Sequence, residues 1–519
     1  MAALTGDFVQ MALSPEELLK GITYRALAGN TRSVEPLRMV TSDSREVVPG
    51  SLFVAVRGYC ADGHQFIGSA IQRGAHAVIC EELPQETAES CLYIIVSDTR
   101  KALAEAARIF YGNASDRLLI IGITGTNGKT TTAKLITAML NSNGIASGYI
   151  GTNLCMIGDR NIVLDRTTPE AHALHALFRE ILEAGCKAVV MEVSSHALVL
   201  QRVYGIRFHA AVFTNLTMEH LDFHTSMQEY AVAKQQLFDQ LSSDGFGVFN
   251  IDDPYASQMA APVDHEQQYC CTLQSGVRQS LTCSRYFKAD IIESTIESSI
   301  VELHFPEALI KMKVRLPGMF NVMNVLEAAA VGSGMGLLPE KICQSLSAVS
   351  AVDGRMERVR DSRMGWSAFV DYAHTPDALY KALDTLHTLK SEGSRLVVVF
   401  GCGGNRDKGK RSAMGRIASE IADEVILTSD NPRDEAPETI LDDIASGITK
   451  GHYRRISDRT EAIRSALSML NRRDILLVAG KGHEQYQEIA GKKYFFSDRD
   501  MIKKYIEQYC SGLPEKEKE

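Results

Sequence analysis

A glycine-rich loop is the clearest candidate for phosphate chemistry in this sequence. The stretch TGTNGKTT occupies residues 124–131, between an apolar run and a helical pattern. Gly125 and Gly128 allow a tight turn that points backbone N–H groups at an anion, and the helix start adds partial positive charge. Lys129 can neutralise the β- and γ-phosphates of a nucleotide, and the hydroxyl of Thr130 can hold Mg²⁺. The first glycine lies one position too early for the spacing of the general phosphate-loop motif. We therefore predict the site from the position of the loop between a strand and a helix.

Acidic, histidine and lysine residues downstream could complete a metal site. Glu192 ends a very apolar run, where a carboxylate is costly unless it is paired or bound to a cation. Beside a nucleotide loop, Mg²⁺ is the natural partner. His220 and His224 are four residues apart, a spacing that could place both on one helix face, and we expect a Mg²⁺ role for His220. Lys234 lies in AKQQLF, where the pattern alone indicates a surface lysine.

The runs that would position these residues alternate between strands and helices. A β-branched run before the glycine loop is typical of a buried parallel strand, and a helix is predicted after the loop. Alternating shorter runs upstream, to about residue 113, predict a small α/β unit. The main predicted elements are strands at Leu118–Ile123, Ala188–Val193, Ala210–Phe213 and Gly247–Asn250, helices at Phe66–Gln72, Lys101–Tyr111 and Thr130–Asn143, and further strands within 292–314.

Three predicted strands near the C-terminus end in charged loops. The strands are Leu396–Phe400, Glu424–Leu427 and Ile475–Ala479, and the loops are GCGGNRDKGKR, TSDNPRD and GKGHE. In open α/β sheets, ligands bind outside the carboxyl ends of the strands. We therefore expect the three loops to share one binding crevice.

The bulk composition narrows the class of protein. A chain of 519 residues is long enough for two to four domains, and its net charge of −9 disfavours non-specific nucleic-acid binding. No apolar run approaches the roughly 20 residues of a membrane span, and the first ten residues lack a signal-peptide pattern. The 11 scattered cysteines contain no Cys-x-x-Cys pair and predict small buried hydrophobes, without a disulfide framework or zinc site. We expect a cytoplasmic protein, with a monomer as the working expectation.

Taken together, the motifs resemble the Mur ligase family. The pieces that carry the resemblance run in order from about Asp43 to Glu484: DSREVVPGSLFVAVRG, DGHQFI, TGTNGKTT, MEVSSHAL, TNLTMEHLDFH, AKQQLF, LPGMFNVMNVLEAAA, DGRMERV, DYAHTPDAL and GCGGNRDKGKR. The resemblance implies an α/β protein of three domains. These are a smaller domain for the UDP end (1–113), a central ATP-binding domain with a P-loop-type parallel sheet (114–351), and a Rossmann-like domain for the incoming amino acid (352–519).

The resemblance also implies roles for individual residues. The family's carbamylated lysine falls on Lys234, where the modification would create a carboxylate-like anion able to hold a second Mg²⁺ with Glu192 and His220. Lys129 joins these three as the catalytic set, and Thr130 joins them as a metal ligand. The nucleotide contacts fall on Gly125, Thr126, Asn127, Gly128, Lys129, Thr130, Thr131, Asn321, Arg355, Asp371 and His374. The contacts to a UDP-linked muramoyl dipeptide fall on Ser44, Thr167, Thr168, Ser194 and Arg202.

The loop DNPR, Asp430–Arg433, bears on the choice of amino acid. Meso-diaminopimelate carries a second amino-acid head, whose carboxylate needs a cation that lysine would not need. Arg433 offers a planar fork for that carboxylate, Arg406 could assist, and Glu484 could accept from the ammonium. Family members that add diaminopimelate resemble DNPR, whereas lysine-adding members differ at the arginine. The expected acceptor site comprises Arg406, Asp430, Asn431, Pro432, Arg433, Gly480 and Glu484.

The resemblance implies a reaction as well as a site. ATP would phosphorylate the D-glutamate of UDP-N-acetylmuramoyl-L-alanyl-D-glutamate, and an amine of meso-diaminopimelate would attack the acyl phosphate, in peptidoglycan precursor synthesis. Positioning and electrostatics would supply most of the catalysis. We also expect domain closure about a hinge near Asp353–Gly354.

Three alternatives predict different chemistry. Arg433 argues against a lysine-adding Mur ligase. The N-terminal DSREVVPG segment argues against a ligase like folylpolyglutamate synthetase. The three charged C-terminal loops argue against a nucleotide-dependent switch, which would need no amino-acid pocket.

Overall fold

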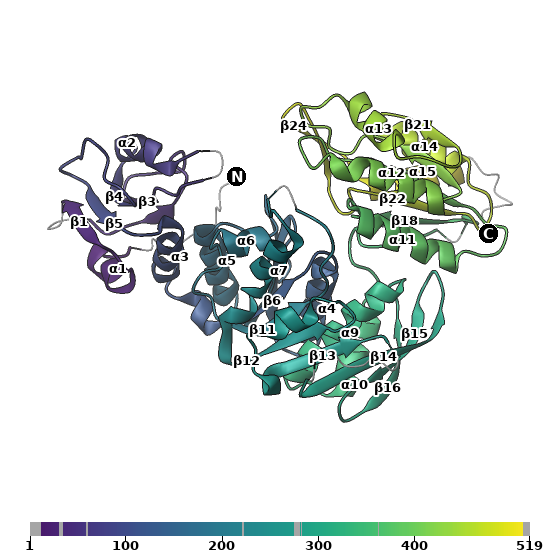
Figure 1. Ribbon diagram of the computed structural model, residues 1–519, viewed down its shortest axis with the longest axis horizontal. Coiled ribbons are helices and arrows are strands. Elements are labelled where there is room, and N and C mark those ends of the chain that lie inside the picture. The colour runs from purple at the N-terminus through teal and green to yellow at the C-terminus, as the bar shows by residue number, and fades with distance from the viewer. Residues whose placement is uncertain are drawn as a thin grey trace.

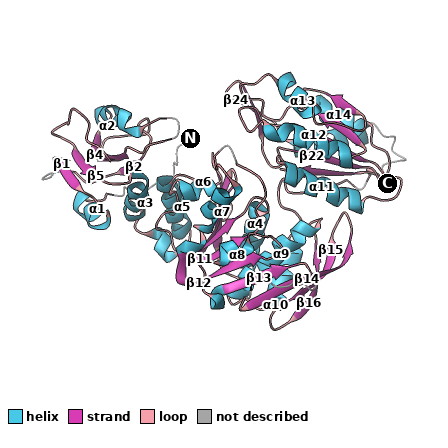
Figure 2. Ribbon diagram, viewed as in Figure 1, coloured by secondary structure: helices cyan, strands magenta, loops and turns pink. Residues whose placement is uncertain are grey.

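Three large sheets organise the chain. The computed structural model describes residues 12–30, 35–58, 61–220, 223–274, 281, 283–361 and 363–511. The sheets succeed one another along the chain as an N-terminal lobe, a central body and a C-terminal lobe (Figure 1), and helices pack on their faces (Figure 2). The predicted three-domain α/β class is confirmed. Each large sheet lies within one of the segments 1–113, 114–351 and 352–519, which remain our proposed domains.

The N-terminal sheet has five strands in the order β1-β5-β4-β3-β2, and β1 is antiparallel to β5. Helix α3 begins where the side chain of Asp98 accepts hydrogen bonds from the N–H groups of Arg100 and Lys101. The elements are α1 (Pro15–Gly21), β1 (Ala26–Gly29), β2 (Met39–Thr41), β3 (Ser51–Val54), α2 (Ile67–Gln72), β4 (Ala75–Cys80), β5 (Leu92–Ile95) and α3 (Thr99–Phe110). The two helices predicted here are therefore present, with their starts shifted.

The central sheet has eleven strands in the order β16-β15-β14-β13-β12-β11-β6-β10-β7-β8-β9. Its middle, from β14 to β7, is parallel as predicted, but β15, β16, β8 and β9 join as antiparallel hairpins at the two ends. The expectation of a parallel sheet is wrong there, because hairpins need no crossover helix. The strands are β6 (Leu119–Thr124), β7 (Ser147–Gly151), β8 (Leu154–Ile157), β9 (Arg160–Val163), β10 (Ala188–Glu192), β11 (Phe208–Phe213), β12 (Leu241–Asn250), β13 (Gln268–Thr272), β14 (Arg285–Ser294), β15 (Ser299–His304) and β16 (Leu309–Val314).

Strand β6 is apolar on both faces because helices cover both. Ile121 and Ile123 join the core formed with α4 and α9, whereas Ile120 joins the core formed with α5. Full burial of one such side chain contributes about 1.5–3 kcal/mol. The helices of this domain are α4 (Lys129–Ser142), α5 (Ala171–Glu183), α6 (Ser195–Val199), α7 (Met227–Gln235), α8 (Ala256–Ala260), α9 (Met319–Gly334) and α10 (Pro339–Ala348).

The C-terminal sheet has six strands in the order β17-β18-β22-β19-β20-β21. The three predicted strands match β19, β20 and β22 residue for residue, and β23 and β24 form a separate hairpin. The elements are β17 (Glu357–Val359), β18 (Ser367–Asp371), α11 (Pro376–Leu389), β19 (Leu396–Phe400), α12 (Gly409–Ile421), β20 (Glu424–Leu427), α13 (Pro437–Ala445), β21 (Tyr453–Arg455), α14 (Arg459–Ser468), β22 (Ile475–Ala479), β23 (Tyr486–Ile489), β24 (Lys492–Phe495) and α15 (Asp498–Ser511).

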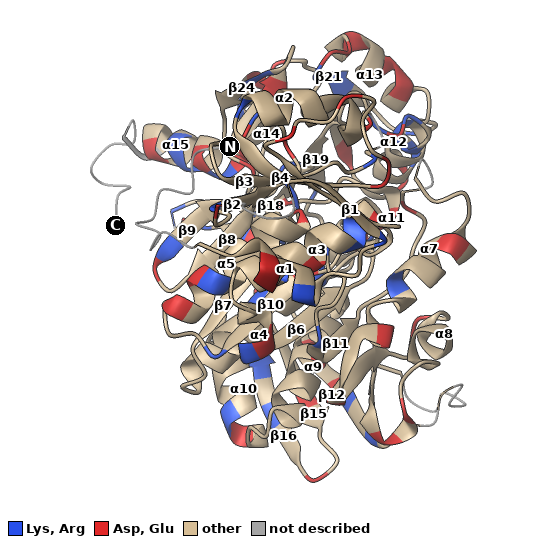
Figure 3. Ribbon diagram, turned by 90° about the vertical axis from the view of Figure 1, so that its left-hand side faces the viewer, with Lys and Arg blue, Asp and Glu red and all other residues tan. Residues whose placement is uncertain are grey.

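The charged surface residues are of mixed sign. Basic and acidic residues are interspersed in the view of Figure 3, and on α5 Arg179 pairs with Glu183 at 2.5 Å. Within the described ranges, no helix is long and apolar enough to cross a membrane.

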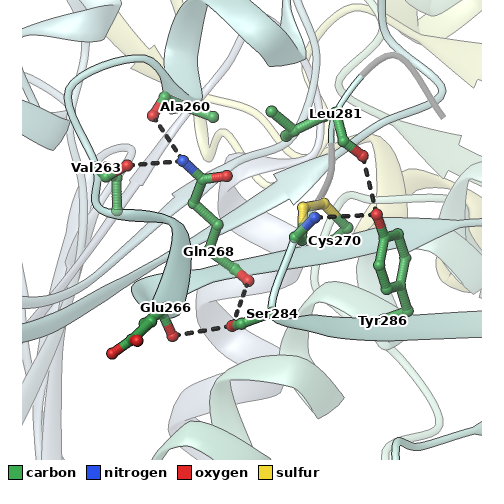
Figure 4. Close-up of a disulfide and its surroundings, with 9 residues drawn as sticks. Ala260, Val263, Glu266, Gln268, Cys270, Leu281, Ser284 and Tyr286 are labelled. Carbon is green, nitrogen blue, oxygen red and sulfur yellow. Dashed lines mark hydrogen bonds between the residues drawn. A yellow bond between two sulfur atoms is a disulfide. The ribbon is translucent and has the colours of Figure 1, made fainter.

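Among the cysteines whose side chains the structure describes, all but one pair follow the prediction. Seven of them are free and buried, as expected of small apolar side chains. Cys270 on β13 is joined to Cys283 by a disulfide, with the Cα atoms 6.1 Å apart (Figure 4). The prediction of cysteines as simple buried apolar side chains is wrong for this pair. The cysteines are 13 residues apart, and they meet because the chain returns beside β13 to form β14, which spacing alone does not reveal.

Candidate active site

One cavity of about 1160 Å³ lies between the central and C-terminal domains. The loops that line it follow β6, β10 and β11 in the central sheet and β18, β19, β20 and β22 in the C-terminal sheet. The carboxyl ends of both sheets therefore open onto the same space. Arg406, Asp430 and Glu484, one from each charged loop, all line it, which confirms the predicted shared crevice.

The phosphate loop lies at the cavity wall and is held by close contacts and hydrogen bonds. Gly125 and Gly128 have φ angles of 150° and 88°, and a Cβ atom on Gly128 would lie 2.6 Å from Oδ1 of Asn324. The ammonium of Lys129 donates to the carbonyl oxygens of Gly125 and Thr126 at 2.9 and 2.8 Å. Burial lowers the pKa of Lys129, while the charges of Glu219 and Glu192 act in the opposite direction. Residues 126–131 all line the cavity, so this loop can contact a nucleotide there.

Glu192 ends β10 as a fully buried carboxylate. It accepts hydrogen bonds from the hydroxyl of Tyr149 at 2.6 Å, and from the backbone N–H and hydroxyl of Thr152, both at 3.1 Å. Burial, together with the Glu192 carboxylate, raises the pKa of Tyr149. The cost of burying this carboxylate is thus offset by neutral donors.

Glu219 is a functional candidate that the sequence analysis missed. It lies 3.7 Å from Nε2 of His220 and 3.6 Å from Nε2 of His374. Burial favours a higher pKa for Glu219, but the hydrogen bond of His374 and the charges of His220, His374 and Lys129 outweigh it and hold the pKa below its usual value. Its position beside His220 in the motif TNLTMEH could have identified it from the sequence. Glu219 places a carboxylate on the cavity wall near Lys129.

His220 and His224 do not share a helix face, so that expectation is wrong. His220 has a φ angle of 57°, and its carbonyl accepts from the N–H of His224, which closes a turn. Helix α7 begins only at Met227, capped by the side chain of Ser226. His220 lines the cavity, whereas Nε2 of His224 lies 2.9 Å from the hydroxyl of Ser195.

Lys234 is buried on α7, with 1% of its surface exposed. Its ammonium donates to the carbonyl oxygen of Gly125 at 2.8 Å and lies 4.5 Å from the ring centre of Tyr230. Burial lowers the pKa of Lys234 far below its usual value, and the charge of Lys129 lowers it further. The surface position indicated by the local pattern is wrong, because α7 packs directly against the phosphate loop.

The oxygen atoms beside the loop fit a magnesium ion bound together with phosphates. Mg²⁺ usually keeps several waters and takes only one or two carboxylates plus substrate phosphates. Thr130, Glu192 and Glu219 line the cavity, and the hydroxyl of Thr130 accepts from Arg355 at 2.9 Å. The part of the chain that the structure describes holds no group of three His, Cys, Asp or Glu residues suited to a metal, so phosphate oxygens would have to complete the coordination.

The residues expected to contact the muramoyl dipeptide form two layers in the central domain. Thr167 and Ser194 line the cavity. Behind them, the hydroxyl of Thr168 donates to the carbonyl of Glu192 at 2.9 Å, and Arg202 donates to the carbonyl of Thr168 at 3.1 Å. Thr168 and Arg202 therefore support this wall. The fifth residue, Ser44, lies in the turn after β2 and is not part of the cavity wall.

The residues expected to contact the nucleotide divide in the same way. Arg355, Asp371 and His374 line the cavity, but Asn321 lies behind it. The side-chain oxygen of Asn321 accepts from Asn324 at 3.1 Å, and Asn324 lines the cavity. One turn of α9 separates the two asparagines. The motif NVMN therefore indicated the correct face of the helix, but the residue predicted from it supports the wall and does not line the cavity.

The expected acceptor site gathers around Arg433. Its guanidinium donates to the carboxylate of Glu488 at 3.1 Å and to the carbonyl of Gly404 at 2.7 Å. Glu484 accepts from Asn431 at 3.0 Å and from Lys481, a fully buried lysine that the sequence analysis missed, at 3.1 Å. All the residues expected at this site line the cavity except Pro432.

The chain matches three family models that together cover most of its length. They are the Mur ligase family catalytic domain over residues 36–111, the Mur ligase middle domain over 123–332, and the Mur ligase glutamate ligase domain over 354–482.

Curated relatives and a solved structure agree with these models. The UDP-N-acetylmuramoyl-L-alanyl-D-glutamate–2,6-diaminopimelate ligase of Chlorobium phaeobacteroides is 59% identical, and the match covers 97% of this chain and 99% of the relative. The enzyme of that name from Chlorobaculum tepidum is 58% identical, with 89% and 91% covered. A solved structure of a ligase with that name is 33% identical with a TM-score of 0.65, covering 92% of this chain and 96% of that one. The chain therefore belongs to the Mur ligase family of ATP-dependent ligases.

Proposed function

We propose that this ligase adds meso-diaminopimelate to the D-glutamate of UDP-N-acetylmuramoyl-L-alanyl-D-glutamate, in the synthesis of peptidoglycan precursors. The observation that carries the proposal is one cavity with the phosphate loop on one wall and Arg433 on the opposite domain. Relatives up to 59% identical bear the name of this reaction. A nucleotide, a carboxylate donor and an amino acid with two charged heads would meet in that cavity.

The first step is phosphoryl transfer. An oxygen of the D-glutamate side-chain carboxylate attacks the γ-phosphorus of ATP, the bond to the β-phosphate oxygen breaks, and ADP leaves. Lys129 and Arg355 border the loop that would receive the phosphates and can neutralise the negative charge that develops there. When Mg²⁺ is bound, held by Thr130 and Glu192, it would supply further charge neutralisation.

The second step forms the amide. A neutral amine of meso-diaminopimelate attacks the acyl carbon, the C–N bond forms, and the tetrahedral intermediate expels phosphate. The proton that the nitrogen loses balances the release of phosphate as hydrogen phosphate. The chain contributes mainly by holding donor and acceptor together in a cavity between two domains, because a correctly placed pair of reactants removes much of the entropic barrier.

Lys234 is the residue we propose to be carbamylated. Burial of Lys234 disfavours its charged form and lowers its pKa, and the neutral amine is the form that reacts with CO₂. The product would place a carboxylate-like anion beside the carbonyl of Gly125 and close to Lys129 and His220, where it could serve as a metal ligand.

The recognition of the acceptor rests on Arg433. Its guanidinium can bind the distal carboxylate of meso-diaminopimelate through two parallel hydrogen bonds. The alternative acceptor, L-lysine, has no distal carboxylate. Lysine would leave these donors unpaired, so the lysine-adding alternative is disfavoured.

Omitting one substrate at a time tests the proposal. With ATP, Mg²⁺, the UDP-dipeptide and meso-diaminopimelate all present, we expect ADP, phosphate and the UDP-tripeptide to form in equal amounts. Each omission should abolish the tripeptide, as followed by liquid chromatography with mass spectrometry. Formation of ADP without any tripeptide in the full mixture would refute the ligase reaction proposed here.

A further inference from the structure

We propose that Glu488 is a positioning residue that orients Arg433 for the distal carboxylate of the acceptor. The proposal rests on the function given above, in which Arg433 binds that carboxylate. Glu488 lies outside the cavity wall, whereas Arg433 lines it, so Glu488 would act through the arginine.

The guanidinium of Arg433 is held at two points. Nε donates to Oε2 of Glu488 at 3.1 Å, and Nη1 donates to the carbonyl of Gly404 at 2.7 Å. The side chains of Arg433 and Glu488 are only 21% and 26% exposed. No hydrogen bond to another described residue is formed by Nη2. A guanidinium has five N–H groups, so three of them, both on Nη2 and one on Nη1, remain for a carboxylate.

The backbone around both residues makes this arrangement specific. Arg433 has a φ angle of 51°, its N–H donates to the carbonyl of Glu488 at 3.1 Å, and its own carbonyl accepts from Ala490 at 2.8 Å. Strand β23 therefore lies in register against the DNPR loop.

Two more contacts join the same strand to the same loop. The side chain of Asn431 accepts from the N–H of Glu488 at 2.9 Å, and the side chain of Gln487 donates to the carbonyl of Asp430 at 2.8 Å. Three residues of the DNPR loop are thus fixed by consecutive residues of β23. Glu488 provides the one contact of this set that reaches the guanidinium.

Orientation of the guanidinium affects affinity because a free arginine side chain has many rotamers. Fixing the fork before the acceptor arrives removes that ordering cost from the binding step. The carboxylate of Glu488 also pairs the positive charge while leaving the outer N–H groups in place. An acceptor without a distal carboxylate would gain nothing from this preorganisation, so Glu488 contributes to selectivity as well as to affinity.

Three variants test the role of Glu488. Glu488→Ala removes the acceptor for Nε, and we expect the KM for meso-diaminopimelate to rise about tenfold, a typical loss for a charge-assisted hydrogen bond. The kcat and the KM values for ATP and the UDP-dipeptide should change less than about twofold. Glu488→Gln keeps an oxygen for Nε and should restore the KM to within about threefold of the unchanged protein. Glu438→Ala, which removes a partner of Arg455 in the same domain, serves as the control and should change none of these constants.

Each possible result supports or overturns the positioning role of Glu488. An unchanged or lower KM for meso-diaminopimelate in Glu488→Ala would overturn the proposal, as would a Gln variant as impaired as the Ala variant. A fall in kcat with a rise in all three KM values and a lower Tm would indicate a structural role and also overturn it. If the unchanged protein shows no turnover that depends on meso-diaminopimelate, the proposed function fails instead, which the unmodified control reveals separately.

Discussion

Two lysines share one carbonyl oxygen at the phosphate loop. The ammonium groups of Lys129 and Lys234 donate to the oxygen of Gly125 at 2.9 and 2.8 Å. Two neighbouring buried cations repel each other, which lowers the pKa of Lys234 in addition to the effect of burial. Carbamylation would replace this repulsion with an attraction to Lys129. The modification therefore has an electrostatic reason in the fold itself.

This residue pair predicts a dependence on CO₂. We expect protein prepared in CO₂-depleted buffer to lose most of its activity and to regain it when bicarbonate is added. Carbon NMR with ¹³C-labelled bicarbonate should show a carbamate resonance that Lys234→Ala lacks. Full activity after CO₂ depletion, with no such resonance, would contradict a carbamylated Lys234.

At the residue scale, the sequence indicated side chains whose neighbours in the chain define a motif. Lys129 and Arg433 were found in this way, and both line the cavity. Glu219 and Lys481 were missed because each also needs a partner that is distant in the sequence, His374 for Glu219 and Asn431 for Lys481. Local patterns also misplaced Lys234, since only the packing of α7 against the phosphate loop shows that it is buried.

A buried histidine on α5 makes the central domain sensitive to acid. His175 is fully buried against Phe178, and neither ring nitrogen has a partner among the described residues. Burial lowers its pKa from 6.5 to about 3. Between these two pH values, His175 therefore binds a proton in the unfolded chain but not in the folded chain. Stability is fully present above about pH 6.5 and falls as the pH drops toward 3.

Replacing His175 by leucine should remove this sensitivity. We expect the free energy of unfolding of the His175→Leu variant, relative to the unchanged protein, to rise by about 2 kcal/mol between pH 7 and pH 5. Urea unfolding at both pH values, followed by circular dichroism, measures the difference. An equal difference at the two pH values would show that His175 is not buried in its neutral form.

A buried ion pair joins the strands that end at the acceptor site. Arg459, the first residue of α14, binds Asp498 at 2.7 Å and donates to the carbonyls of Ser429 and Ala479, next to the DNPR and GKGHE loops. Arg459→Ala leaves a buried carboxylate unpaired and should destabilise the protein by about 3–5 kcal/mol. Arg455→Ala, which breaks exposed pairs, should cost less than about 1 kcal/mol in the same unfolding assay. Equal losses in the two variants would contradict this account.

At the element scale, the accuracy of the sequence prediction followed burial. Strands β19, β20 and β22 were predicted to the residue because each is a short apolar run that ends at a charged loop. Strands β15 and β16 fall within the predicted range 292–314, which reaches only the last residues of β14. Their antiparallel pairing was not predicted, because they pair through hairpins at the sheet end. Pairing partners are a property of the whole sheet, which the local pattern does not contain.

At the scale of the whole molecule, polar contacts join the central and C-terminal domains. Asp377 on α11 accepts from Asn127 of the phosphate loop at 2.7 Å and from Thr217 at 3.3 Å. The chain passes between the domains near Gly354, where a φ angle of 63° and the close backbone of His483 leave no room for a side chain. Polar contacts of this kind can be exchanged when two domains move relative to one another.

We therefore predict that substrates draw the domains together. Small-angle X-ray scattering should give a smaller radius of gyration with a non-hydrolysable ATP analogue and the UDP-dipeptide than without them. Gly354→Ala should weaken this change, because the added Cβ meets the N–H of His483. Superimposable scattering curves with and without the ligands would contradict closure.

We propose that Arg433 makes this ligase select meso-diaminopimelate. The most direct test is phosphate release by the purified protein with ATP, Mg²⁺ and UDP-N-acetylmuramoyl-L-alanyl-D-glutamate, in parallel reactions with meso-diaminopimelate, L-lysine or no acceptor. We expect phosphate release in the reaction with meso-diaminopimelate and in neither of the other two. Release with L-lysine in its place would contradict the role given to Arg433, and release that needs no acceptor would contradict the ligase reaction as a whole.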